Sequence, residues 1–119
     1  MAILSHLLPE PLRADLTPVL HRLEEQLQPR GLWLFGSWAR GQQSRRSDID
    51  LLILGLDDER LLDAYDRALR AIEPSRLPVQ PLVAGESLLK RHGDSPFWRG
   101  IRADAIPLLE GSRFPVTIR

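Results

Sequence analysis

Apolar residues recur along this chain in two alternating patterns. Stripes spaced by three and four residues predict helices, and short unbroken apolar runs predict buried strands. The first stripe predicts a regular helix that begins at Pro18 and ends before Gly31. A looser turn is expected to precede it from Pro11. Thr17 fits the N-cap of that helix. The stripe consists of Leu12, Leu16, Val19, Leu20, Leu23 and Leu27.

Three apolar runs, at residues 31–36, 48–54 and 77–83, predict strands. The third run contains Pro78 and Pro81 and therefore predicts a short or edge strand, because proline cannot donate to a central ladder. A last short strand is predicted at 106–109. The polar segment 37–47 predicts one helical turn and a loop.

The most regular stripe predicts a helix that Asp57 and Asp58 open and Pro74 ends. Its predicted apolar face is Leu61, Leu62, Tyr65, Ala68, Leu69 and Ile72. A short helix is expected at 86–91, and another with Ser95 as its cap. This element order predicts an α/β (α+β) fold class, with a small mixed sheet flanked by helices. The length of 119 residues predicts a single domain, 1–119.

Composition narrows the function classes. The chain is 43% hydrophobic and 27% charged, which are ordinary globular values and exclude a disordered chain. Lys plus Arg and Asp plus Glu both number 16, and this zero net charge argues against a nucleic-acid partner. The absence of cysteine excludes disulfides and thiolate metal sites. No apolar run approaches the roughly 18 residues of a membrane span, and the first residues make a poor signal peptide. We therefore expect a cytoplasmic protein with no membrane partner.

Two aspartates stand at the start of the central predicted strand. Strand alternation places Asp48 and Asp50 on one face. Two carboxylates that close repel each other unless a cation compensates them. Mg²⁺ prefers oxygen ligands and is typically held by one or two carboxylates plus substrate phosphates. Taken alone, the pair fits equally well a phosphate-bound Mg²⁺ or two solvated side chains at a strand entrance.

A Gly-Ser pair ends the preceding predicted strand. Gly36 would allow a phosphate to approach closely, and Ser37 would add a hydroxyl donor at a helical turn. An ordinary turn capped by Ser37 fits the same residues. Arg40 would hold a phosphate or pair with one of the aspartates, and Gly41 lets the chain turn back.

The combination is more specific than its parts. It resembles the signature of the DNA polymerase beta-type nucleotidyltransferase superfamily, which pairs Gly-Ser with a downstream Asp-x-Asp. More closely, residues 36–41 (GSWARG) followed by 47–51 (SDIDL) resemble the minimal nucleotidyltransferases, called MNT proteins, of bacteria and archaea. The resemblance is densest from Leu32 to Leu54.

The resemblance implies a palm-like sheet in which Gly36 and Ser37 hold the triphosphate of ATP while Asp48 and Asp50 hold Mg²⁺. An acceptor hydroxyl would attack the α-phosphorus, and pyrophosphate would leave. Proteins similar to this one are often encoded beside a helical HEPN protein. The family is known for antitoxins that neutralise this toxin, in some cases by adding AMP to its tyrosine. A HEPN-type helical partner is therefore expected, and it would supply the acceptor.

One position departs from the family pattern. Members usually carry a third carboxylate on a later strand, and Gln80 stands where this chain would place it. A Gln amide offers one neutral oxygen but carries no charge. Two hypotheses follow: an enzyme that transfers AMP to a protein, as the antitoxin of a HEPN/MNT toxin–antitoxin pair, or a degenerate nucleotidyltransferase-fold protein that acts by binding its partner.

Overall fold

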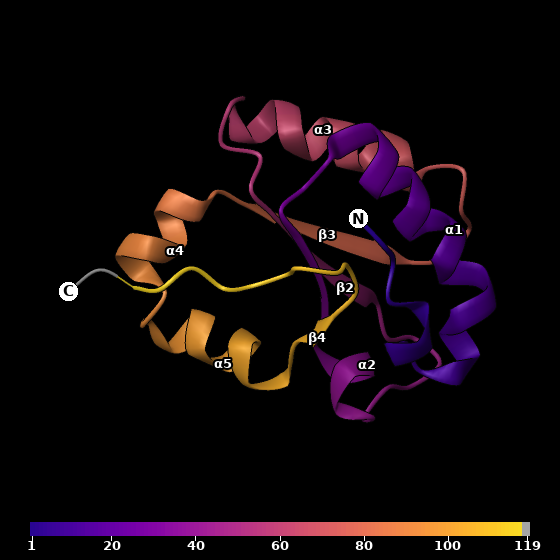
Figure 1. Cartoon of the computed structure of the whole chain (residues 1–119). Coiled ribbons are helices and arrows are strands. Elements are labelled where there is room, and N and C mark those ends of the chain that lie inside the picture. The colour runs from indigo at the N-terminus through magenta and orange to yellow at the C-terminus, as the bar shows by residue number, and fades with distance from the viewer. Residues whose placement is uncertain (118–119) are drawn as a thin grey trace.

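The computed structural model describes residues 1–117 as a four-stranded mixed sheet with helices on both faces (Figure 1). The elements in chain order are η1 (Ser5–Leu7), α1 (Glu10–Leu27), β1 (Gly31–Phe35), α2 (Ser37–Arg40), β2 (Ile49–Leu54), α3 (Leu61–Ile72), β3 (Val79–Ala84), α4 (Glu86–His92), α5 (Pro96–Asp104) and β4 (Ile106–Pro107). The strand order is β3-β2-β1-β4; β1 is antiparallel to β2 and β4, and β3 is parallel to β2. The predicted fold class is confirmed.

Strand alternation divides the apolar side chains between the two faces of the sheet. In β2, Ile49, Leu51 and Ile53 belong to a first hydrophobic cluster, which α1 and α3 cover. Leu52 and Leu54 belong to a second cluster, which α4, α5 and the C-terminal segment cover. The central strand is therefore buried from both sides, which holds its first residues in place.

The first helix begins earlier than predicted. It starts at Glu10 and contains Pro18 in its interior, so the expected start at Pro18 was wrong. The stripe on both sides of the proline is buried on one face, and its burial outweighs the roughly 3 kcal/mol that an interior proline costs. Thr17 does not cap the helix, because its hydroxyl donates to the carbonyl oxygen of Arg13 at 2.6 Å.

The helix α3 differs from its prediction in two ways. It begins only at Leu61, and Asp57 instead accepts hydrogen bonds from the backbone N–H of Glu86 and Ser87, at 3.0 and 3.4 Å, at the start of α4. Its buried residues are Ala64, Ala68, Ala71 and Ile72. Leu61, Leu62, Tyr65 and Leu69, which were expected to be buried, are exposed. The small alanines let α3 pack closely on its neighbours.

The strand β3 forms one edge of the sheet, as its prolines predicted. The carbonyl oxygens of Pro78 and Ala84 accept hydrogen bonds from the N–H groups of Ile49, the first residue of β2, and Gly55, the residue after that strand. By alternation, the backbone groups of odd-numbered residues, Pro81 among them, point to the free edge. The missing N–H of Pro81 therefore costs no ladder bond and removes a donor from the exposed edge. The predicted cap of α5 is also confirmed: Ser95 Oγ accepts from the N–H of Trp98 at 3.4 Å.

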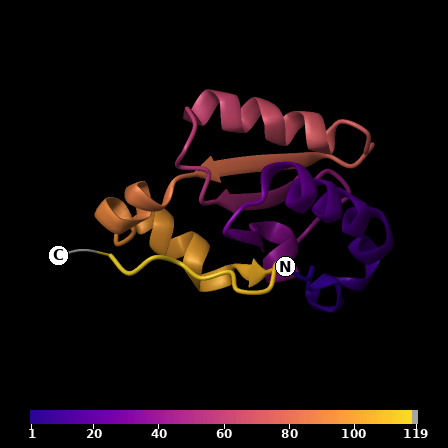
Figure 2. The same cartoon turned by 45° about the horizontal axis from the view of Figure 1, so that its top comes forward.

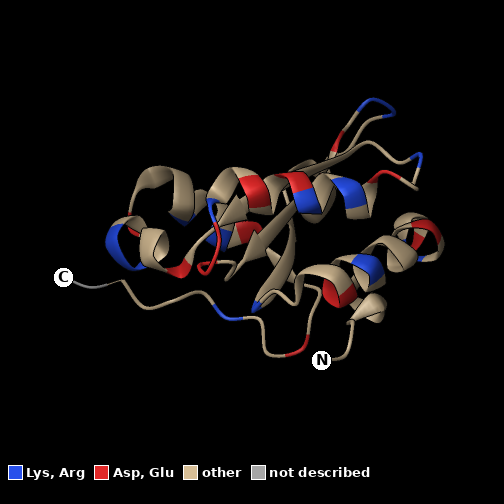
Figure 3. Ribbon diagram, turned by 90° about the horizontal axis from the view of Figure 1, so that it is seen from above, with Lys and Arg blue, Asp and Glu red and all other residues tan. Residues whose placement is uncertain are grey.

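Charges of both signs are interspersed over the molecule. In the view of Figure 3, acidic and basic positions alternate along the helices and do not gather into one basic face. Among residues 1–117, no helix is both long and apolar enough to cross a membrane.

Removing the Asp57 side chain should weaken α4. We expect Asp57→Ala to lower the free energy of unfolding by about 1 kcal/mol, because two N–H groups at the start of the helix lose their acceptor. Urea denaturation would measure this loss. Asp58→Ala, an exposed carboxylate next to it, is the matched control and should change stability little; equal effects of both variants would contradict the capping role.

Candidate functional site

The turn from β1 into α2 requires glycine at position 36. Gly36 has φ of 77° and ψ of −155°, a backbone conformation that is essentially limited to glycine. A Cβ built there would lie 2.2 Å from Oδ2 of Asp50. The carboxylate of Asp50 is thus packed directly against the turn. The Gly-Ser pair and the second aspartate, which are separated in sequence, meet here.

Asp50 is placed by the register of the sheet. It lies opposite Phe35 on β1 and opposite Gln80 on β3. Because Leu52 belongs to the second cluster, strand alternation puts the Asp50 side chain on the same face of the sheet as Leu52. Asp50 lies at the start of β2, next to this cluster but outside it. Asp48 precedes β2 and is exposed. The predicted placement of the two aspartates near each other is supported by their electrostatic interaction.

Burial raises the pKa of Asp50 above 3.8, its usual value. The negative charge of Asp48 raises this pKa further, and the positive charge of Arg40 lowers it. Desolvation and like charge both disfavour the ionised form. The folded protein therefore disfavours the ionised form of the Asp50 carboxylate, and a bound cation would stabilise that form.

Arg40 ends α2 and reaches towards two acidic groups. Besides its electrostatic effect on Asp50, its Nη1 lies 3.6 Å from Oδ2 of Asp104, and its Nε donates to Gln42 Oε1 at 3.2 Å. Asp104 is the last residue of α5, where the helix dipole disfavours a carboxylate. Sequence reasoning missed Asp104, because no local spacing links it to the motif. The one signal in the sequence is its place at the C-terminal end of a helix, where an acidic residue is unfavourable.

Ser37 and Trp38 lie at the start of α2. Within the described chain, the Ser37 hydroxyl makes no hydrogen bond to protein, and the backbone N–H groups of Ala39 and Arg40 are already bonded to the Gly36 carbonyl. Trp38 is partly buried and packs against the first cluster. The free hydroxyl is thus one polar group that this turn offers to a ligand.

Gln80 occupies the position predicted for the third carboxylate, directly beside Asp50 in the parallel register. It is exposed on the edge strand. Glu86 does not replace it, because it lies after the opposite end of β3 and pairs with Arg30 at 3.4 Å. Among residues 1–117, no three His, Cys, Asp or Glu side chains are grouped so that they could hold a metal ion by themselves.

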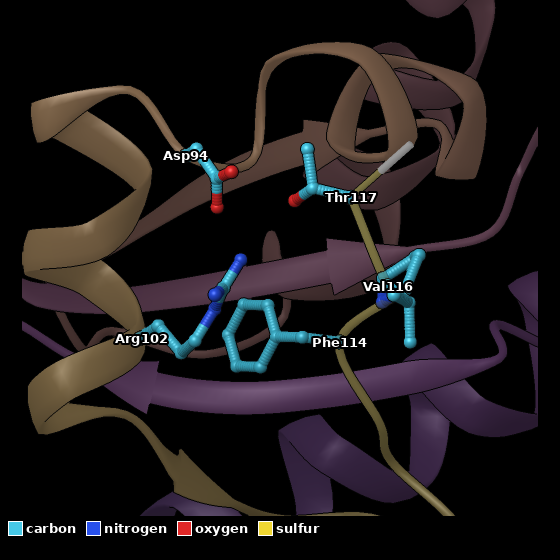
Figure 4. Close-up of a pocket in the computed structure, with 6 residues that line it drawn as sticks. Asp94, Arg102, Phe114, Val116 and Thr117 are labelled. Atoms are coloured by element: carbon cyan, nitrogen blue, oxygen red, sulfur yellow. The ribbon is translucent and has the colours of Figure 1, made fainter. Parts of the chain in front are cut away.

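A cavity of about 590 Å³ lies elsewhere, between α5 and the C-terminal segment (Figure 4). Its lining residues are Asp94, Arg102, Phe114, Pro115, Val116 and Thr117. None of them belongs to the motif. Phe114 stacks on Trp33 with ring centroids 4.5 Å apart, so the segment beside this cavity completes the second cluster.

Gly36→Ala should destabilise the protein. The left-handed conformation and the contact with Asp50 predict a loss of about 1–3 kcal/mol in the free energy of unfolding. Thermal or urea denaturation would measure it. The control is Gly100→Ala in α5, where a Cβ meets nothing within 4 Å and helix propensity predicts a gain. A Gly36→Ala variant as stable as the Gly100→Ala variant would contradict the packing described here.

Asp50→Asn should stabilise the protein at neutral pH in the absence of metal and nucleotide. The folded-state pKa of Asp50 is raised, so its ionisation destabilises the fold as pH rises above 3.8. The stability advantage of Asn should shrink as pH falls towards 3.8 and vanish below it. Denaturation at a series of pH values tests this. Asp58→Asn controls for the change in net charge; an equal gain in that variant would contradict the prediction.

Comparisons with known proteins identify a family and a fold for this chain. The family described as "Polymerase beta, Nucleotidyltransferase" matches residues 19–78. A protein of Sulfolobus solfataricus assigned as a nucleotidyltransferase has a similar structure, with a TM-score of 0.52, 24% identity and 78% of each chain covered. A chain from a toxin–antitoxin structure containing AMP-PNP is similar too, with a TM-score of 0.56, 20% identity and coverage of 78% of this chain and 71% of that one.

At these identities, the two structures establish similarity of fold. No curated protein matches the chain. The family match covers half of the chain and includes every predicted site residue except Gln80, which lies just beyond it. The resemblance inferred from the Gly-Ser and Asp-x-Asp motifs is thereby confirmed, and the chain belongs to the polymerase beta nucleotidyltransferase family.

Proposed function

We propose that this protein is a Mg²⁺-dependent nucleotidyltransferase that transfers AMP from ATP to a hydroxyl of a protein acceptor. The observation that carries the proposal is the packing of the Gly36 turn against the Asp50 carboxylate, with Asp48 and Arg40 within electrostatic reach. Phosphate-binding backbone and metal-binding carboxylates must be neighbours for this chemistry.

The donor set fits magnesium in the presence of a nucleotide. Asp48 and Asp50 offer two carboxylates of like charge, and burial already disfavours the ionised form of Asp50. Mg²⁺ is commonly held by one or two carboxylates together with substrate phosphates. Bound there, it would neutralise charge on the phosphates and on the attacking and leaving oxygens.

The chain's own residues would bind and orient the nucleotide. Gly36 leaves room for the Asp50 carboxylate, which keeps the metal ligands beside the turn. The Ser37 hydroxyl would donate to a phosphate oxygen, and the Arg40 guanidinium would offset phosphate charge. In the transfer, the acceptor oxygen would form a bond to the α-phosphorus while the bond from the α-phosphorus to the oxygen bridging to the β-phosphate breaks. Pyrophosphate would leave, and the hydroxyl proton of the acceptor would be released to water. Catalysis of this kind consists mainly of positioning and electrostatic stabilisation.

Gln80 bears on the nature of the acceptor. Its amide cannot take the proton of an attacking hydroxyl. An acceptor that ionises more readily than an aliphatic alcohol needs less help, and the phenol of tyrosine, with a pKa of about 10, is the protein hydroxyl that does so. A tyrosine acceptor is therefore the best match to this site.

The proposed partner is a helical HEPN-type toxin that carries the acceptor, so that the chain acts as an antitoxin. The fold similarity to a chain from a toxin–antitoxin structure with AMP-PNP supports this role. Gln80 favours one second candidate: a degenerate nucleotidyltransferase that neutralises its partner by binding alone.

Transfer of label from α-labelled ATP, with Mg²⁺, into a lysate of the source cell tests the proposal. We expect a labelled protein with the wild-type chain and none with the Asp48→Ala, Asp50→Ala double variant, since that variant loses both metal-binding carboxylates. Asp58→Ala, an exposed aspartate in the β2–α3 loop, is the matched control and should label normally. Transfer by the double variant would exclude this site as the source of activity.

Gln80→Asp separates the two candidate functions. If the wild-type chain labels nothing while still binding ATP by calorimetry, the binding-only function gains support. A strong gain of labelling by Gln80→Asp in the same assay would then show that position 80 is where catalysis was lost.

A further inference from the structure

The helix α3 exposes an apolar strip that the fold leaves uncovered. Leu62 is 81% exposed and Leu61 56%, and Tyr65 and Leu69 are each 39% exposed. Leu61, Tyr65 and Leu69 are spaced by four residues, and Leu62 and Leu69 by seven, so all four lie along one side of the helix. Contiguous exposed apolar side chains of this kind mark interaction surfaces.

The strip lies on the flank of α3 that is turned away from α1. Arg22 of α1 donates to the carbonyl oxygen of Ala71 at 2.8 Å, and Arg67 donates to the backbone of Gln26. These contacts attach α1 to one flank, while the alanines face the sheet. Figure 2 shows α3 along the margin of the molecule, above β3, with no element on its outer side.

A depression of about 480 Å³ lies on the same flank, at the C-terminal end of α3. Its lining residues are Asp66, Leu69, Arg70, Ile72, Glu73 and Ser75. Leu62, the most exposed leucine of the helix, stands about two to three turns away towards the N-terminal end. The same flank of α3 therefore carries the exposed side chain of Leu62 and a depression whose lining includes Leu69 and Ile72.

We propose that two copies of this chain associate through α3, antiparallel about a two-fold axis, with Leu62 of each copy seated in the depression of the other. A two-fold interface is self-complementary: the contact of one residue with another is repeated in reverse. The spacing of Leu62 and Glu73 places the axis near the middle of α3.

The charged side chains that line the depression also support the antiparallel arrangement. Asp66 and Arg70 form an ion pair at 2.8 Å on the flank of the depression, with the acid nearer the N-terminal end. An antiparallel pair centred between them brings Asp66 of each copy to Arg70 of the other. Two further arginines, at the start of α3 and within it, are also paired: Arg60 with Asp63 and Arg67 with Glu59. The surface therefore has no excess charge that would attract a nucleic acid.

The free edge of β3, next to this surface, is a poor site for strand addition because Pro81 lacks the N–H that would point outwards. Of the two elements at this side of the molecule, α3 is therefore better suited than the edge of β3 to bind another protein surface. The site at Asp50 lies on the opposite face of the sheet from α3, so association through α3 leaves both sites open.

Sedimentation equilibrium over a series of concentrations tests the proposal. One helix of 12 residues is a small contact compared with the roughly 800 Å² per partner of a standard interface, so we expect a concentration-dependent rise from 13.5 kDa to twice that mass. Leu62→Asp should remain at 13.5 kDa with an unchanged circular dichroism spectrum, because this side chain is exposed. The Asp48→Ala, Asp50→Ala variant should still double its mass, which separates this proposal from the proposed activity.

Disulfide trapping tests the geometry, because the chain has no cysteine of its own. An oxidised mixture of the Leu62→Cys and Glu73→Cys variants should give a disulfide-linked pair on a non-reducing gel. Neither variant alone should do so, because in an antiparallel pair each cysteine lies far from its own symmetry mate. A monomeric mass up to the solubility limit would overturn the proposal and leave α3 to an unlike protein or another segment. Equal trapping by Leu62→Cys alone would overturn the antiparallel arrangement.

Discussion

The close approach of Gly36 to the Asp50 carboxylate determines how the rest of the site is arranged. The antiparallel register sets Phe35 opposite Asp50, and the chain must leave β1 one residue later, beside the carboxylate. A Cβ at position 36 would lie 2.2 Å from Asp50 Oδ2, so only glycine allows α2 to begin there. The same contact makes the turn and the carboxylate neighbours, as the proposed nucleotide and metal sites require.

The protein maintains this contact at an electrostatic cost. Burial and the charge of Asp48 oppose ionisation of Asp50, and Arg40 offsets them only in part. The strand tolerates the cost because Ile49, Leu51 and Leu52 anchor it in apolar clusters on both faces. A local arrangement that costs stability is a common result of selection for function rather than stability.

The proximity of the turn and the aspartates in the candidate site could be predicted from the sequence, because Gly36, Ser37, Asp48 and Asp50 lie within one short segment whose strands pair with each other. Asp104 could not, since only the packing of α5 brings it to Arg40. The exposed side of α3 could not be predicted either. Its apolar residues cover about half of the helix circumference, and the alanines, not the leucines, allow the close contact with α1 and the sheet. The predicted start of α1 at Pro18 was wrong, because burial of a long apolar stripe outweighs the low helix propensity of proline.

The two faces of the sheet separate the two kinds of contact that the molecule offers. Along β2, the odd-numbered residues pack beneath α1 and α3, and the even-numbered residues continue the face that bears Asp50. A molecule that binds α3 therefore has no direct access to the carboxylates. Because α4, α5 and the C-terminal segment cover the apolar part of the second face, the Asp50 carboxylate is accessible from the end of the sheet where Asp48 and Gln80 are exposed.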